Sequence, residues 1–173
     1  MVVFVPLDLT LHKDEFIQLN YETMDWHFKQ FTEHYQIEVE PRLGKTARQI
    51  AESSIETYRD LKPPKGIFYL LQVDDEIAGM GALRKLDNGI GELKRMWNRT
   101  QYRGRGFGKL MVKKLLEKGD EISCEGYGLS TPRFTFAAHH VYESFGFEVV
   151  ESIDEIEVAD WVVPYYILMK KNP

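Results

Sequence analysis

The chain has 173 residues and a formal net charge of −5, with 43% hydrophobic and 28% charged residues, as expected for one globular domain. Its longest apolar run, Trp161–Met169, has nine residues and a proline, which excludes a membrane-spanning helix of about 20 residues. The single cysteine excludes an internal disulfide and favours a reducing, cytoplasmic location. The amino terminus has neither a cationic start nor a small-residue cleavage site, so no signal peptide is expected.

Two helices are predicted in the first third of the chain. Residues 1–5 form a short strand that ends at a proline, and apolar residues at intervals of three and four then predict an amphipathic helix over 17–35. A looser stretch runs to residue 44. Thr46 and Gln49 have the spacing of a capping box, which opens a second helix toward residue 61 that the following two prolines end.

After these helices the hydrophobic pattern becomes one that is typical of strands. Apolar runs over 67–73, 77–83 and 90–97 predict an antiparallel meander, and the Asn-Gly pair at 88–89 is a hairpin signal between the last two. A helix is predicted to run to Lys118 and to end at Gly119.

The last third of the chain alternates strands with one more helix. Residues 122–129 are expected to form a strand, with Cys124 as a small buried residue within it. Residues 138–145 carry a helical stripe, and 147–150 and 165–170 are the last strands. The order predicts an α/β (α+β) fold with a mixed, mostly antiparallel sheet of about six to seven strands, flanked by about four helices.

A basic, glycine-rich segment stands out from this acidic chain. Residues 94–118 contain nine Lys or Arg and one acid, and they include the stretch YRGRGFGKLMVKKLL at 102–116. A strand that leads through glycines into a helix binds anions, because glycine allows close approach and positive φ while free N–H groups and the helix dipole converge there. The localised charge favours a compact anionic ligand over general nucleic-acid affinity.

Three known phosphate or nucleic-acid motifs fit this segment poorly. A Walker loop requires Ser or Thr after Gly108-Lys109, where this chain has Leu110. A dinucleotide fingerprint requires a different glycine spacing within a parallel βαβ unit. Arg105–Gly108 match the start of an RNA-recognition octapeptide, but its next aromatic position is a lysine and the segment is predicted to be helical.

Arg103–Gly108 instead fit the pattern Arg/Gln-x-x-Gly-x-Gly/Ala, preceded by the strand GELKRMWNRT. Together with VYESFGFEVV at 141–150 and VDDEIAGMGAL at 73–83, this loop resembles the acetyl-CoA signature of the GNAT superfamily of N-acetyltransferases. The resemblance covers about 67–150, and the two amino-terminal helices match in order only. It implies a single GNAT domain over 1–173, with 1–64 on the acceptor side and an acetyl-CoA-binding core over 65–173.

The resemblance also implies where acetyl-CoA binds. The pantetheine arm is expected to pair with the edge of the fourth strand where it separates from the fifth, and the pyrophosphate to lie on the loop. Thr135 stands where the family often has an asparagine that contacts the coenzyme. The implied binding residues are Met96, Trp97, Asn98, Arg103, Gly104, Arg105, Gly106, Phe107, Gly108, Lys109 and Thr135.

Two residues match catalytic positions of the family. Tyr142 matches the tyrosine that protonates the departing thiolate, although its stripe is also typical of a core aromatic. Glu92 matches a base that deprotonates the amine through water; the alternative is a surface glutamate paired with a lysine. Strand alternation places Glu92, Lys94 and Met96 on one face, opposite Leu93, Arg95 and Trp97.

The expected function is transfer of acetyl from acetyl-CoA to the primary amine of a small molecule or peptide, by direct attack in a ternary complex. Residues 1–60 contain 11 acids and 6 bases, which favours a cationic amine if they form the acceptor wall. Trp26, Tyr35 and Trp161 are candidates for that wall or for the core. A non-catalytic acyl-CoA sensor and a small RNA-binding module are the alternatives.

Several partners and sites are not expected. No metal site is predicted, because His27 and His34 lack an HExxH pattern or a cysteine pair and are typical of a solvated helix surface. Neither a nucleic-acid nor a membrane partner is expected. A homodimer is possible by analogy with relatives.

Overall fold

The computed structural model describes residues 1–156 and 158–173, which form one seven-stranded sheet with five α-helices around it. The strand order is β1-β2-β3-β4-β5-β7-β6, and only β4 and β5 are parallel. The strands are β1 (Val2–Pro6), β2 (Gly66–Val73), β3 (Glu76–Lys85), β4 (Ile90–Asn98), β5 (Gly126–Pro132), β6 (Glu148–Val150) and β7 (Tyr166–Lys171). The helices are α1 (Leu9–Tyr35), α2 (Val39–Leu43), α3 (Ala47–Tyr58), α4 (Phe107–Glu121) and α5 (Phe136–Glu143), with 3₁₀ turns η1 (Thr100–Tyr102) and η2 (Asp160–Tyr165).

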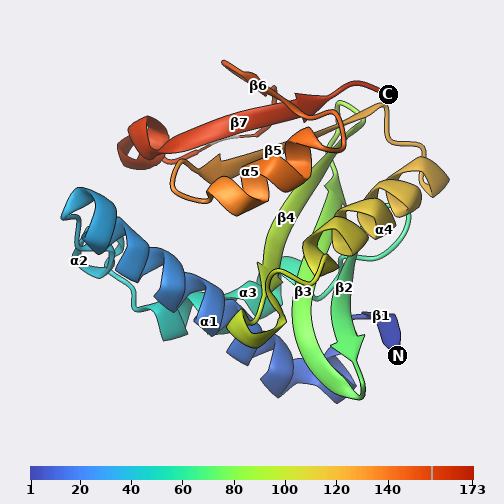
Figure 1. The fold of residues 1–173 in the computed structure, drawn as a ribbon, viewed down its shortest axis with the longest axis horizontal. Coiled ribbons are helices and arrows are strands. Elements are labelled where there is room, and N and C mark those ends of the chain that lie inside the picture. The colour runs from blue at the N-terminus through green and yellow to red at the C-terminus, as the bar shows by residue number, and fades with distance from the viewer. Residues whose placement is uncertain (157) are drawn as a thin grey trace.

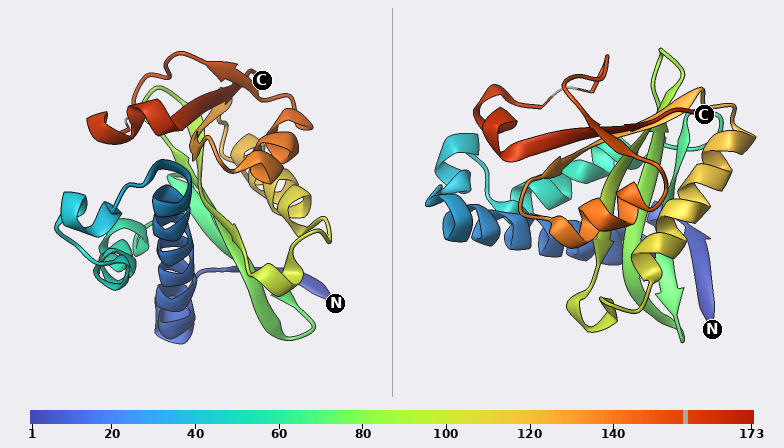
Figure 2. Two further views of the ribbon diagram at one scale, coloured as in Figure 1. Left: turned by 60° about the vertical axis from the view of Figure 1, so that its left-hand side comes forward. Right: turned by 45° about the horizontal axis from the view of Figure 1, so that its top comes forward.

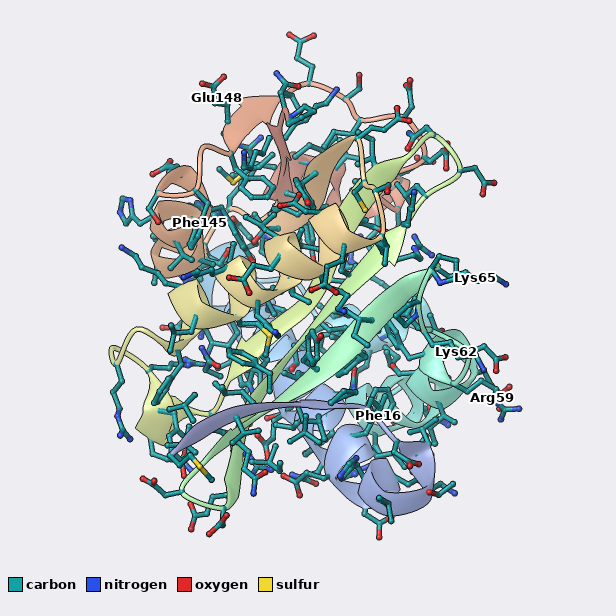
Figure 3. The ribbon with its side chains drawn as sticks, turned by 90° about the vertical axis from the view of Figure 1, so that its right-hand side faces the viewer. Phe16, Arg59, Lys62, Lys65, Phe145 and Glu148 are labelled. Atoms are coloured by element: carbon teal, nitrogen blue, oxygen red, sulfur yellow. The ribbon has the colours of Figure 1, made fainter. Side chains whose placement is uncertain are left out.

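Helices cover both faces of the central strands. Figure 2 (left) shows α1, α2 and α3 on one side of the sheet, and α4 and α5 on the other. Phe68 and Leu70 of β2 pack toward α1 and α3, whereas Tyr69 and Leu71 pack toward α4. Phe16 of α1 is fully buried on the first of these faces (Figure 3). Burial on both faces explains why the β2 sequence is a continuous apolar run and not an alternating one.

The sheet divides into two arms at the β4–β5 junction. These strands pair only at Ile90, Glu92 and the residue between them, and then diverge (Figure 1). The carboxyl-terminal half of α1 spans the arms, because Trp26 packs against Trp97 of β4 and against Phe134, just after β5. An aromatic cluster made of α1, the residues after β5 and η2 therefore lies where the strands separate.

The predicted mixed, mostly antiparallel fold is confirmed, but several boundaries were wrong. The first helix begins at Leu9, where Asp8 accepts from the Thr10 N–H, and not at residue 17. Residues 39–43, expected to be irregular, form α2. The α4 helix continues past Gly119 to Glu121, because this glycine serves packing and not termination: a Cβ there would lie 2.4 Å from the Tyr127 ring.

The strand predicted at 122–129 also begins later than expected. Residues 122–123 form a turn after α4, residues 124–125 are irregular, and β5 begins at Gly126. Cys124 therefore lies between this turn and β5, half-buried, and not within a strand. Its burial raises the pKa of the thiol, which agrees with an unreactive cysteine.

A β-bulge in β4 overturns the predicted alternation. Met80 pairs with Trp97 and Ala82 pairs with Lys94. Two residues of β4, Arg95 and Met96, therefore lie opposite a single residue of β3, Gly81. The extra residue reverses the pattern, and Arg95 adopts a φ of 56°. Met96 consequently packs with Leu93 on the α4 face, while Arg95 and Trp97 lie on the α1 face. Positive φ at a non-glycine residue costs about 1–3 kcal/mol and is concentrated at functional sites.

Candidate active site

The glycine loop is an exposed turn at the mouth of α4. Gly104 and Gly106 adopt φ values of 73° and 82°, which other residues rarely take, and Gly106 is the amino-terminal cap of the helix. The first intrahelical bond runs from the Leu110 N–H to the Gly106 carbonyl. The N–H groups of 107–109 therefore have no partner within the helix, an arrangement that binds anions at helix amino termini.

The side chain of Asn98 lies against this helix terminus. With its amide oriented to satisfy both neighbours, it donates to the Trp97 carbonyl at 3.1 Å and accepts from the Gly108 N–H at 3.2 Å. An amide oxygen thus occupies a position that an anionic oxygen can take. The expectation that Asn98 acts through its backbone alone was incomplete, since its side chain touches the loop.

The edge of β4 beyond Glu92 is unpaired on the β5 side. The last parallel pair is Glu92 with Gly128, so the backbone over 93–98 has no β5 partner. Exposed strand edges present N–H and C=O groups that an extended chain can pair with. Met96, Trp97 and Asn98 lie on this free edge, as the predicted pantetheine contact requires.

The two loop arginines differ in direction. Arg103 lies over the rings of Trp97 and Trp26, at 4.5 and 5.1 Å from their centroids, and its Nε donates to the Asn98 carbonyl at 3.1 Å. Burial lowers the pKa of this guanidinium. Arg105 lies over Tyr102 and Phe107 instead. Arg103 therefore links the loop to α1 across the end of β4, and Arg105 stays on the loop.

Tyr142 lies on α5 and is 5% exposed, within the core cluster that also contains Phe107 of the loop. Its ring packs against Phe147 at 5.9 Å. Among the described residues its hydroxyl has no hydrogen-bond partner, and burial raises the pKa of the phenol well above its usual value near 10. A high phenol pKa keeps the proton on the oxygen, as a donor to a thiolate requires.

Glu92 is buried and fully engaged. Its side chain is 3% exposed; one oxygen accepts from Arg84 Nη2 at 2.6 Å and Nε at 3.1 Å, and the other accepts from Lys94 at 2.9 Å. A buried carboxylate that accepts three hydrogen bonds from two cations is held in one orientation. The structure thus shows a lysine partner, as the alternative interpretation expected, but at a buried position and not on the surface.

Thr135, at the amino-terminal end of α5, is also occupied. Its hydroxyl donates to the Pro132 carbonyl at 2.7 Å and lies 2.8 Å from the Thr131 hydroxyl. His139 lies 3.2 Å away and reaches the same Pro132 carbonyl. The hydroxyl therefore joins α5 to the end of β5. A hydrogen bond from Thr135 to the coenzyme would compete with these existing hydrogen bonds.

A groove of about 490 Å³ lies beside the end of β4. Trp26 and Trp97 line it with Glu22, Asp25 and other residues of α1 and η1. Of the three candidate wall aromatics, Trp26 lines this groove and borders the diverging strands. Tyr35 and Trp161 pack with Phe31 in the aromatic cluster.

Sequence reasoning missed three residues at the β4 bulge: Arg95 within it, and His27 and Tyr166, on which the charge of Arg95 acts. The expectation of a solvated His27 was wrong, because its ring packs against Trp26 and Phe134 and is only partly exposed. This burial and the charges of Arg95 and Arg103 lower the pKa of its imidazole to about 4. Burial raises the pKa of Tyr166 to about 12, against the effect of Arg95. A signal for His27 was available: it lies three residues after Met24 and four before Phe31, on the buried stripe of the helix.

We expect His27 to make folding stability depend on pH. Its pKa is about 4 in the folded protein and about 6.5 when unfolded, so the unfolded chain binds the proton first. The stabilisation is complete above pH 6.5 and is lost as pH falls toward 4, by about 2 kcal/mol at pH 5. Urea unfolding at pH 7.5 and 5.0 measures this, and a His27→Gln variant should show a smaller loss. An equal loss in both proteins would show that other groups dominate.

None of the helices in the described part of the chain combines the length and apolar character that crossing a bilayer requires. Within residues 1–156 and 158–173, no three His, Cys, Asp or Glu side chains gather in a way that would hold a metal ion.

Comparison with known proteins identifies the family. The model of the acetyltransferase (GNAT) family matches residues 20–147. An uncharacterized N-acetyltransferase, YsnE of Bacillus subtilis, is 32% identical over 53% of this chain and 62% of its own length. Human N-acetylaspartate synthetase is 34% identical over 59% of this chain, which spans only 34% of that protein.

Solved structures agree on the fold. PaiA N-acetyltransferase from Thermoplasma acidophilum, in complex with coenzyme A, superposes with a TM-score of 0.71 over 100% of this chain and 99% of its own. The two sequences are 15% identical, so this likeness concerns the fold alone.

Proposed function

This chain belongs to the GNAT acetyltransferase family, and on that premise we propose that it transfers an acetyl group from acetyl-CoA to a primary amine by direct attack in a ternary complex. The observation that carries the proposal is the exposed glycine turn with free N–H groups, placed directly beside the unpaired edge of β4. One element suits a pyrophosphate and the other an extended pantetheine arm. The coenzyme A complex of the PaiA fold neighbour supports the same ligand.

On the coenzyme side, the proposed contacts divide by type. The N–H groups of 104–109 and the charges of Arg105 and Lys109 bind the pyrophosphate. The edge of β4 at Met96 and Asn98 orients the arm by backbone hydrogen bonds. These contacts would place the thioester between the diverging strands, below the α1 aromatic residues.

The chemistry needs a neutral amine, a carbonyl carbon and a proton for the leaving sulfur. The amine nitrogen attacks the thioester carbon, the C–S bond breaks, and the Tyr142 phenol gives its proton to the thiolate. Proton transfer back to the phenolate from the attacking nitrogen, through water, restores the tyrosine. The uncommitted hydroxyl of Tyr142 suits this role.

We propose that Glu92 accepts, through water, the proton that a cationic amine must lose before it attacks, as its position in the family implies. Because its oxygens already bind Arg84 and Lys94, a structural role is the competing explanation. A Glu92→Gln variant is expected to lose about 10²-fold in kcat/KM and to change the acidic limb of the pH–rate profile. A lower rate with an unchanged profile would leave Glu92 only the structural role.

The acceptor is a small-molecule or peptide amine. Several relatives are N-acetylaspartate synthetases, named for an acetylated amino acid, which supports a small amino-acid-like acceptor. A non-catalytic acyl-CoA sensor on the same fold is the rival, because the buried, fully paired Glu92 would also suit a site without turnover.

Two assays in sequence test the proposal. Acetyl-CoA at a hundred times its Kd should stabilise the protein by about 2.7 kcal/mol in a thermal-shift titration, and RNA should not. Release of free thiol with a panel of amines then distinguishes an enzyme from a sensor. Stabilisation without thiol release for any amine would establish the sensor, and no stabilisation would reject both.

A further inference from the structure

Arg95 is the most unusual residue of β4. It occupies the bulge with a φ of 56°, where an extra residue turns its side chain toward α1 and α3. Bulges near active sites re-aim single side chains in this way. Because β4 and β5 part three residues earlier, at Glu92, this side chain lies on the face covered by α1 and α3, at the start of the divergence.

The guanidinium of Arg95 lacks a carboxylate partner among the described residues. Its Nη1 contacts the Met24 sulfur at 3.8 Å and its Nη2 the Ser54 hydroxyl at 3.3 Å, both weak contacts, and its buried Nε makes no hydrogen bond. Neighbouring cations differ, since Arg84 and Lys94 share Glu92 and Arg99 pairs with two glutamates of α1. A half-buried cation without a counter-ion is costly unless a ligand supplies one.

A second polar group beside Arg95 is also unsatisfied. The Tyr58 hydroxyl, on a side chain 3% exposed, makes no well-formed hydrogen bond in the described part of the chain, although Arg95 lies close enough to oppose the effect of burial on the pKa of its phenol. The Arg95 guanidinium lies 5.7 Å from the centre of the Tyr58 ring. Two unpaired donors thus come from β4 and α3 to one place, and an anionic oxygen is the group that both would bind.

The charges around this place are positive. Arg95 and Arg103 both act on His27, which is neutral at pH 7, and Glu92, an acid that acts on Tyr58, is neutralised by Arg84 and Lys94. Met24 is the residue of α1 that contacts Arg95, and the two acids that flank it in sequence have other partners. Glu22 pairs with Arg99, and Asp25 pairs with Lys29. The local sign is therefore opposite to the acidic average of residues 1–60.

We propose that Arg95, with Tyr58, binds a carboxylate of the acceptor, so that the substrate is an amine that carries a carboxylate, such as an amino acid. This inference rests on the proposed acetyl transfer and narrows its acceptor class. A carboxylate paired with Arg95 fixes one end of the acceptor and leaves the amine directed to the diverging strands. Polyamine-like acceptors, which the acidic amino-terminal third favours on average, would be repelled.

Matched acceptors test the proposal. Thiol release is measured with amino acids, the same amino acids as carboxamides, and the corresponding decarboxylated amines, for the wild type, Arg95→Met and Arg95→Lys. The wild type should prefer the acids, and Arg95→Met should lose about 10- to 100-fold in kcat/KM for acids while changing little for the carboxamides. Arg95→Lys, which keeps the charge without the planar fork, should retain part of the preference.

The matched control is Arg59→Met. Arg59 follows the end of α3, pairs with Glu56 and has a side chain that is 50% exposed (Figure 3). The Arg59→Met substitution removes one positive charge from the region of α3 without changing the bulge. The preference of the enzyme for acids should therefore be unchanged. Thermal shift with acetyl-CoA confirms that each variant folds and binds the coenzyme.

The outcomes separate the two claims. Turnover of carboxamides and acids at equal efficiency, or an Arg95→Met variant with the wild-type preference, would overturn the inference and leave acetyl transfer standing. Normal stabilisation by acetyl-CoA with no turnover of any amine would overturn both. A preference for acids that disappears in Arg95→Met and persists in Arg59→Met would establish the carboxylate site.

Discussion

Gly106→Ala is expected to weaken acetyl-CoA binding by about 10- to 100-fold. Gly106 caps α4 with a φ of 82°, where a Cβ costs roughly 1–2 kcal/mol, so the alanine variant will shift the turn toward ordinary φ values. That shift misaligns the N–H groups proposed to bind the pyrophosphate, and each hydrogen bond to a charged group is worth about 1.5–3 kcal/mol. Isothermal titration with acetyl-CoA measures the loss.

Gly44→Ala is the matched control for backbone strain. Gly44 has a φ of 64° at the end of α2, and a Cβ there, as at Gly106, would meet nothing within 4 Å. Both variants should lose similar stability, about 1 kcal/mol, from the same conformational penalty. Only Gly106→Ala should lose affinity. Equal affinities in the two variants would show that the turn does not bind the coenzyme.

Tyr142→Phe is expected to lower kcat by about 10²-fold at saturating substrates, with unchanged acetyl-CoA affinity. General acid catalysis contributes a factor of this order, and phenylalanine has no proton to give to the thiolate. Folding stability should change little, because the hydroxyl has no hydrogen-bond partner among the described residues to lose. Stopped-flow detection of thiol and urea unfolding measure the two quantities.

Tyr127→Phe provides the converse control. Tyr127 lies in the same core cluster, but its hydroxyl bonds to Asp120 and, at 3.0 Å, to the Leu116 carbonyl. Its removal should cost about 1–3 kcal/mol of stability and leave kcat unchanged. If Tyr142→Phe retains full kcat, or if both variants lose kcat in proportion to stability, Tyr142 is a core residue and not the acid.

Local patterns predicted most of the fold. The capping box at Thr46 and Gln49 forms as expected, and the hairpin signal joins β3 to β4. These features depend on neighbouring residues, so the sequence displays them directly. The start of α1 was missed because residues 9–15 are mostly polar and carry no stripe, while one side-chain contact from Asp8 begins the helix.

The candidate site was only partly predictable, because its geometry depends on contacts between distant segments. Nothing around Arg95 in the sequence signals a bulge; the bulge follows from pairing with β3, where Gly81 admits Met96. The pairing of Glu92 with Arg84 likewise joins two strands. His27 lies near the site because α1 packs against Phe134, which follows β5. The helical pattern of α1 alone does not reveal this contact.

A crystal structure of the protein with coenzyme A tests the central claim most directly. The account predicts pyrophosphate oxygens on the N–H groups of 104–109, a pantetheine arm paired with β4 at Met96 and Asn98, and a sulfur within hydrogen-bond distance of the Tyr142 hydroxyl. Coenzyme A bound elsewhere, or bound on the loop with its sulfur directed away from Tyr142, would contradict it.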